Sequence, residues 1–255
     1  MPLSTFSNTL FIGKVFLTME KLDSTNTHAI ELLSKNNPSE GTVISAWNQA
    51  DGRGQIGRKW QSEAGKNLTF SIIFYPDFLP AKQQFILNQA IALGVYDFVN
   101  RFLDNVKIKW PNDIYVGDKK ICGILIQNVL SGMNIQSSVT GIGMNINQAE
   151  FDNSIPNPTS LFLETNTQFD LMPLLGIFCE KIETRYLQLR AGNYSLIQND
   201  YLKNLYRFQE PSLFQYTEGE IFNGKIVGLM ESGKLIIHHN KGEESFDMRQ
   251  VIFLI

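Results

Sequence analysis

The chain has 255 residues, of which 43% are hydrophobic and 18% are charged. These proportions are ordinary for a globular protein, and the length allows one or two domains with a substantial core. The formal net charge is -3, so the overall charge provides no attraction to nucleic acid or to an anionic membrane surface. We therefore expect neither of them as a partner.

The chain carries no pattern for targeting or for metal binding. Its N-terminal residues do not resemble a signal peptide, and no stretch reaches the roughly 18 apolar residues of a membrane span, so we expect a cytoplasmic protein. The two cysteines, Cys122 and Cys179, lie far apart without nearby histidines, which favours reduced, buried thiols. The histidines lack metal-ligand spacing, so we expect no transition-metal site.

Strand-like and helix-like patterns mix through the first two hundred residues, which indicates an α+β fold. Residues 23–26 supply N-cap chemistry, and a helix is expected to begin near Thr25. Residues 42–47 and 68–75 are β-branched or aromatic runs that predict strands. Residues 83–102 carry apolar side chains at helical spacing.

A strand and a hairpin are expected next. Residues 106–110 alternate apolar side chains with Lys107 and Lys109, which predicts a half-buried strand with two lysines on its polar face. Residues 114–116 and 119–129 predict the two strands of the hairpin. The Gly-Asp pair between them suits a type II′ turn, because glycine occupies its first position.

Further elements complete a larger first domain, which we place at residues 1–208. A strand-like run ends in residues 140–147, and the helical period returns over residues 169–189 and 194–206. These elements predict a sheet with helices packed on it.

The remaining residues, 209–255, read as a second domain made of short strands. Glycines punctuate brief apolar runs there, which predicts a small β-barrel. Because so small a unit is barely stable alone, we expect it to dock on the larger domain.

The segment 49–60 contains G-x-G-x-x-G, a pattern found in dinucleotide-binding turns and in kinase loops. Neither context holds, because no helix follows at once and the other kinase motifs are absent. The segment carries Arg53, Arg58 and Lys59 among glycines whose amides can approach an anion, which predicts phosphate or carboxylate binding. An exposed turn with incidental positive charge is the alternative for this segment alone.

The segment 107–127 holds a lysine in an unusual place. Strand parity predicts that Lys120 shares a face with Cys122, Ile124 and Ile126, so that an ammonium ends an apolar row. Such a lysine needs an anionic partner. The alternative is a lysine on an edge strand whose charge reaches solvent.

Three motifs in order resemble the biotin protein ligase family. They are S-T-N at residues 24–26, Q-x-x-G-R-G-x-x-G-R-x-W at 49–60, and K-W-P-N-D followed by K-x-x-G-I-L at 109–125. Residues 141–147 resemble the family's G-x-G-x-N segment, so the resemblance spans nearly the whole chain. It implies a mixed sheet with packed helices, related to class II aminoacyl-tRNA synthetases, and an SH3-like barrel at the C-terminus.

The resemblance implies a two-step enzyme, a biotin–[biotin carboxyl carrier protein] ligase. Biotin's carboxylate would attack the α-phosphate of ATP, with Mg²⁺ screening the phosphates, to give biotinyl-5′-AMP. The biotin would then pass to a lysine of a biotin carboxyl carrier protein domain. Because two anions must meet in the first step, cations and positioning are the main physical demand.

The resemblance also implies the residues of the site. Lys120 should contact both biotin's carboxylate and the α-phosphate, and Asp113 should orient or deprotonate the acceptor lysine. The implied catalytic residues are Lys120, Arg53 and Asp113. The implied biotin-binding residues are Ser24, Thr25, Asn26, Gln49, Gly52, Arg53, Lys120, Gly123, Gly141 and Gly143. The implied ATP-binding or adenylate-binding residues are Arg53, Gln55, Arg58, Trp60, Lys109, Asn112, Lys120 and Asn145.

The sequence departs from the family at two positions. Gln55 stands where many members have arginine, and Gln127 where many have glutamate, so either would alter adenylate retention or affinity. Only 23 residues precede Ser24, so we expect no N-terminal DNA-binding domain. A non-catalytic biotin sensor and a lipoate ligase are the alternatives, and both monomer and homodimer stay open.

Overall fold

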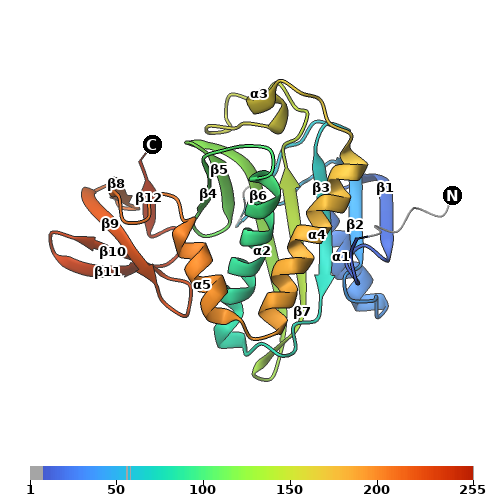
Figure 1. Cartoon of the computed structure of the whole chain (residues 1–255), viewed down its shortest axis with the longest axis horizontal. Helices are drawn as coiled ribbons and strands as arrows, with labels where there is room; N and C mark the ends of the chain where they lie inside the picture. Colours follow the sequence, from blue (N-terminus) through green and yellow to red (C-terminus); the bar gives the residue numbers. More distant parts are fainter. Residues whose placement is uncertain (1–7, 56, 58, 255) are drawn as a thin grey trace.

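The computed structural model describes residues 8–55, 57 and 59–254. A seven-stranded mixed sheet is its centre, with a five-stranded antiparallel sheet at one end of the molecule (Figure 1). The strands of the larger sheet are β1 (Phe16–Leu22), β2 (Val43–Gln49), β3 (Leu68–Phe74), β4 (Val106–Lys109), β5 (Asp113–Val116), β6 (Lys119–Ser131) and β7 (Asn134–Met144). Their order is β1-β2-β3-β7-β6-β5-β4, and only β1 and β2 pair in parallel.

Helices cover both faces of this sheet. The helices are α1 (Thr25–Lys35), α2 (Gln84–Val99), α3 (Leu161–Thr165), α4 (Leu171–Arg190) and α5 (Tyr194–Lys203), with a short 3-10 helix (Ala81–Gln83) before α2. Helix α1 packs on one face, while α2 and α4 lie side by side on the other (Figure 1). The sheet is therefore a layer between one helix and a helix pair.

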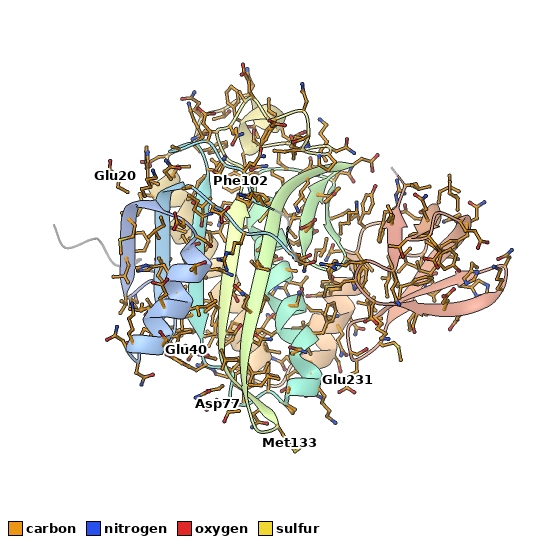
Figure 2. All side chains as sticks on the ribbon, turned by 180° about the vertical axis from the view of Figure 1, so that it is seen from behind. Glu20, Glu40, Asp77, Phe102, Met133 and Glu231 are labelled. Carbon is orange, nitrogen blue, oxygen red and sulfur yellow. The ribbon has the colours of Figure 1, made fainter. Side chains whose placement is uncertain are left out.

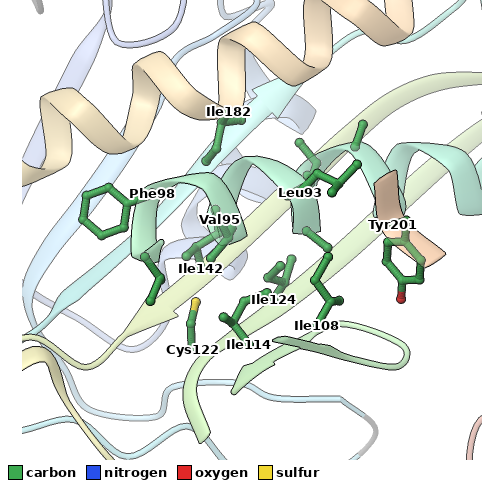
Figure 3. Close-up of a cluster of buried hydrophobic side chains, with 14 of the residues drawn as sticks. Leu93, Val95, Phe98, Ile108, Ile114, Cys122, Ile124, Ile142, Ile182 and Tyr201 are labelled. Carbon is green, nitrogen blue, oxygen red and sulfur yellow. The ribbon is translucent and has the colours of Figure 1, made fainter. Parts of the chain in front are cut away.

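The main core lies between the sheet and the pair α2 and α4. Cys122, Ile124 and Ile142 of β6 and β7 point towards α2 (Figure 3). Gly94 allows α4 to come close to α2, because a Cβ at this position would lie 2.8 Å from the Cα of Ile182. This close approach of the two helices gives the dense packing that a protein interior requires.

The predicted elements of the first domain correspond to observed ones. Helices near Thr25 and over residues 83–102, 169–189 and 194–206 are confirmed as α1, α2, α4 and α5. The two-residue hairpin turn is also confirmed, with Gly117 at a φ of 56°. Strand β1 and helix α3 were not predicted from the sequence. β1 mixes apolar and charged residues without a regular alternation, and α3 is only five residues long.

The prediction that Lys120 shares a face with Cys122 is wrong. The pairing of β5 with β6 shifts register, with Ile114 opposite Cys122 and Tyr115 opposite Lys120. The extra residue, Ile121, makes a β-bulge, which reverses the alternation of side chains along the strand. Lys120 therefore extends over the α1 side of the sheet.

The smaller sheet holds β8 (Pro211–Tyr216), β9 (Ile221–Leu229), β10 (Leu235–His239), β11 (Gly242–Phe246) and β12 (Val251–Phe253) in the order β11-β10-β9-β8-β12. It docks on the larger part, as expected from its size. Trp110 Nε1 donates a hydrogen bond of 2.9 Å to the carbonyl of Gly233, and a Cβ on Gly233 would stand 2.4 Å from the ring of Phe85. One hydrophobic cluster runs through both parts.

Candidate functional site

The sheet carries a glycine floor on its α1 side, made of Gly123, Gly141 and Gly143. Gly123 pairs with Gly143 across β6 and β7, and Gly141 lies two residues before Gly143. Figure 2 looks onto this side, with α1 in front of the sheet. A Cβ on Gly143 would lie 2.3 Å from the ring of Trp60, and one on Gly141 would lie 2.1 Å from Asn26 Oδ1. Only glycine lets these groups rest on the strands.

Charged side chains stand in line with this floor. Cross-strand partners form one row over β4, β5, β6, β7 and β3, namely Lys109, Asp113, Gly123, Gly143 and Thr69. The K-W-P-N-D and G-x-G-x-N motifs are thereby brought together, although some thirty residues separate them in the sequence. Lys109 therefore places a cation at the β4 end of the row.

Lys120 is the central cation of the site. Its Nζ lies 2.8 Å from Asp113 Oδ2, with both side chains about a quarter exposed, and 5.7 Å from the centre of the Trp60 ring. Its backbone is held from both sides, because its N–H donates to Asn157 and its carbonyl accepts from Thr159. An ammonium has three donors, so Lys120 can hold an incoming anion without leaving Asp113.

Lys109 lies in an aromatic enclosure formed by Tyr115, Tyr206 and Phe253. Its Nζ donates a hydrogen bond of 3.2 Å to the hydroxyl of Tyr115, and it lies 5.9 Å from the ring of Tyr206 and 5.3 Å from that of Phe253. Burial among these rings lowers the pKa of Lys109 to about 8, although Asp113 acts in the opposite direction. This lysine therefore loses its charge at mildly alkaline pH.

The segment 49–60 folds back over the floor. Arg53 and Lys59 form a β-bridge, and the N–H of Trp60 donates to the carbonyl of Gly52. Lys59 makes an ion pair of 2.7 Å with Asp51, which lowers the pKa of Asp51 through the hydrogen bond and the charge of Lys59. Because Lys59 is paired with Asp51, the exposed Arg53 is the described loop cation that remains available to an anionic ligand. Arg58, also predicted as a site residue, lies outside the described residues.

Trp60 lies flat on the floor with one polar atom unsatisfied. Its Nε1 is buried and has no hydrogen-bond partner within residues 8–55, 57 and 59–254. A Cβ on Gly143 would stand 2.5 Å from this nitrogen. Buried indole donors usually have partners, so this one is available to a polar group that enters the site.

The beginning of α1 forms a polar network at the other end of the floor. The N–H of Thr25 donates to Gln49 Oε1 at 2.7 Å. Asn26 donates from Nδ2 to the carbonyl of Leu125 at 3.2 Å and to Gln127 Oε1 at 2.9 Å. Ser24 is the N-cap of α1, yet its side chain makes no capping hydrogen bond. The S-T-N motif therefore meets Gln49 and Gln127.

Two asparagines predicted for ATP binding bond the main chain near Lys120. Asn112 Nδ2 donates to the carbonyl of Ile124, whose N–H donates back to Asn112. Asn145 Nδ2 donates to the carbonyl of Thr159 at 2.9 Å, while its buried Oδ1 has no partner in the described part of the chain. Asn112 therefore holds β6 four residues after Lys120, and Asn145 holds the segment at Thr159, whose N–H donates to the Lys120 carbonyl.

Neither Ser71 nor the aromatic enclosure of Lys109 was predicted from the sequence. Ser71 links Thr25 with Asn26, and a hydroxyl within the apolar run of β3 was a usable signal. No signal in the sequence indicated Tyr206 and Phe253, because they lie about a hundred residues or more from Lys109 along the chain.

A sequence profile described as the Biotin/lipoate A/B protein ligase family matches residues 18–145 of the chain. The Biotin--[acetyl-CoA-carboxylase] ligase of Paracoccus denitrificans is 29% identical over 248 residues, which cover 92% of this chain and 99% of that protein. The Bifunctional ligase/repressor BirA of Bacillus subtilis (strain 168) is 29% identical over 240 residues, covering 91% of this chain and 71% of that protein.

Solved structures agree with the sequence matches. The biotin protein ligase from Aquifex aeolicus in complex with biotin and ATP has a TM-score of 0.77 and 26% identity to this chain, covering 94% of this chain and 99% of that one. The profile match spans half of the chain and contains the S-T-N, glycine-loop and K-W-P-N-D motifs. This chain therefore belongs to the biotin/lipoate A/B protein ligase family.

Proposed function

We infer that the chain is an ATP-dependent biotin protein ligase. The observation that carries this function is the position of Lys120, whose ammonium stands beside the glycine floor with Trp60 over the same glycines. A flat floor with a cation at one side suits an elongated ligand that ends in a carboxylate. Biotin has this form, and relatives covered over nearly their whole length are named biotin ligases.

In the first step, an oxygen of biotin's carboxylate attacks the α-phosphorus of ATP. The bond from that phosphorus to the bridging oxygen breaks, pyrophosphate leaves, and biotinyl-5′-AMP forms. Lys120 neutralises both reacting anions, while Arg53, Arg58 and Lys109 offset the remaining phosphate charge. Gln55, Trp60, Asn112 and Asn145 complete the proposed ATP subsite.

Mg²⁺ would enter this step with ATP. Within residues 8–55, 57 and 59–254, no group of three or more His, Cys, Asp or Glu could hold a metal ion. Mg²⁺ is commonly held by substrate phosphates and water with few protein ligands. We therefore assign it to the phosphates of the substrate.

The proposed biotin subsite lies between Thr25 and Lys120. Thr25 and Gln49 would bind the ureido ring, and Lys120 the carboxylate. Ser24, Asn26, Gly52, Arg53, Gly123, Gly141 and Gly143 complete it. Closing the loop over the intermediate would shield the mixed anhydride from water until an acceptor arrives.

In the second step, the neutral amine of an acceptor lysine attacks the acyl carbon of biotinyl-5′-AMP, and AMP leaves as the amide forms. We propose a biotin carboxyl carrier protein domain as the acceptor. Asp113 would orient the amine or take its proton, since it lies beside Lys120 and hence beside the acyl group.

We propose a catalytic domain over residues 1–208 and an SH3-like barrel over residues 209–255, supported by the five antiparallel strands of the latter. None of the described helices combines the length and apolar character needed to cross a membrane. We propose a cytoplasmic enzyme without a nucleic-acid or membrane partner.

A transfer assay tests the function. The protein is incubated with biotin, Mg-ATP and a biotin carboxyl carrier protein domain, and the mass of the acceptor is measured. We expect the biotin increment with the wild type and none with Lys120→Ala. Pyrophosphate release without acceptor separates an enzyme from a biotin sensor, and parallel reactions with lipoate and a lipoyl domain test the other ligase class. Transfer of lipoate alone, or of neither acid, contradicts the proposed function.

A further inference from the structure

Ser71 is a polar residue in a strand that is otherwise closed to solvent. All seven residues of β3 are buried, and Ser71 has no exposed surface. A buried hydroxyl costs free energy unless it is hydrogen-bonded. Ser71 Oγ lies 2.8 Å from Thr25 Oγ1 and 2.6 Å from Asn26 Oδ1. It therefore joins the two motif residues at the start of α1.

Chemistry fixes the direction of these hydrogen bonds. The Asn26 amide nitrogen must face the carbonyl of Leu125, which only accepts, so Asn26 Oδ1 faces Ser71 and accepts its single proton. Ser71 then has only lone pairs left for Thr25. The Thr25 hydroxyl must donate to Ser71, and it can only accept from anything else.

The start of α1 also fixes the orientation of the Gln49 side-chain amide. Its Oε1 accepts from the N–H of Thr25, so its Nε2 points elsewhere, 3.1 Å from where a Cβ on Gly52 would stand. Thr25 Oγ1 thus has acceptor capacity left and Gln49 Nε2 has donor capacity left, and both residues belong to the proposed biotin subsite. A ureido ring has the complementary groups, N–H donors and a carbonyl acceptor.

We propose that Ser71 is a positioning residue that makes the Thr25 hydroxyl an obligate acceptor and so selects substrates with an N–H group at that point. The inference rests on the proposed biotin subsite. Ser71 acts through Thr25, and no contact between Ser71 and the substrate is required. Without Ser71, the Thr25 proton is free to turn towards the ligand, and the preference for an N–H group is lost.

Two substitutions of the same kind on opposite faces of the sheet test this proposal. Ser71→Ala removes the proposed positioning group. Ser138→Ala is the matched control, because Ser138 is equally buried, lies on β7 with the parity of the α2 side, and has a hydroxyl without a partner in the described part of the chain. Ser71→Thr keeps the hydroxyl and should rescue the effect.

Adenylation is measured by pyrophosphate release, with biotin and with biotin methylated on one ureido nitrogen. For Ser71→Ala we expect the KM for biotin to rise about tenfold, the size of one hydrogen bond to a polar group. The KM for ATP and kcat should stay within about twofold, and discrimination against the methylated compound should fall by about the same factor of ten. Ser138→Ala should leave all four values at those of the wild type.

The outcomes separate this proposal from the function it rests on. A wild type that releases no pyrophosphate with biotin overturns the proposed function itself. An active wild type whose KM for biotin and discrimination are unchanged by Ser71→Ala overturns the role of Ser71. So does an equal change in Ser138→Ala, or a fall in kcat and thermal stability of Ser71→Ala with no change in discrimination.

Discussion

At the scale of single residues, Lys109 links the charge of the site to pH. Burial among aromatic rings brings the pKa of Lys109 down from 10.5 to about 8, so it is mostly protonated below pH 8 and mostly neutral above it. We expect kcat/KM for ATP to fall as pH rises through about 8. Lys109→Arg stays charged throughout, so its pH–rate profile should lack this decline. Identical profiles for the two proteins would contradict this role.

Asp113 allows the two chemical steps to be separated. Asp113→Asn keeps the size of the side chain but removes the negative charge next to Lys120. We expect transfer from preformed biotinyl-5′-AMP to the acceptor to slow by about 100-fold, as for loss of a general base. Pyrophosphate release should change far less, because the first step needs no base. Single-turnover transfer at the wild-type rate would remove Asp113 from the mechanism.

At the scale of elements, β-branched and aromatic runs predicted β2 and β3, and apolar residues at helical spacing predicted α2 and α4. Periodicity failed at Lys120, where the extra residue Ile121 reverses strand parity. A bulge cannot be predicted from the periodicity of one strand, because it is a shift in register relative to the partner strand. The motifs indicated Thr25 and Gln49, whereas the contact of Ser71 with Thr25, 46 residues away along the chain, exists only in the folded sheet.

The glycine floor can be tested by adding a single methyl group to it. In Gly143→Ala, the new Cβ would stand 2.3 Å from the Trp60 ring, so Trp60 must leave the floor. Overpacking of this kind costs about 1–3 kcal/mol. We expect the KM values for biotin and ATP to rise by about ten- to a hundredfold, with the tryptophan fluorescence altered.

Gly228→Ala is the control for this substitution. Gly228 is also a strand glycine, but the nearest atom to an added Cβ is 3.8 Å away, which is ordinary van der Waals contact. Its KM values should equal those of the wild type. If Gly143→Ala behaves like Gly228→Ala, the glycines do not define the floor of the substrate site.

At the scale of the whole molecule, the smaller sheet is part of the environment of the site. Phe253 of β12 contacts the Lys109 ammonium, and Tyr206, which precedes the smaller sheet, forms another wall of the enclosure. The hydrophobic core is continuous across both parts. The C-terminal strands thereby influence the charge of a lysine in β4.

This coupling predicts the effect of Phe253→Ala. Removing the ring admits water to Lys109, so the pKa of Lys109 should rise from about 8 towards its ordinary value of 10.5. Burial is the largest cause of the lowered pKa, so its loss should outweigh the lost cation–π attraction. The decline of kcat/KM for ATP should therefore move to higher pH. Ile252→Ala, at an exposed neighbour on the same strand, should leave the profile unchanged, and a Phe253→Ala profile that matches it would show that the smaller sheet does not tune Lys109.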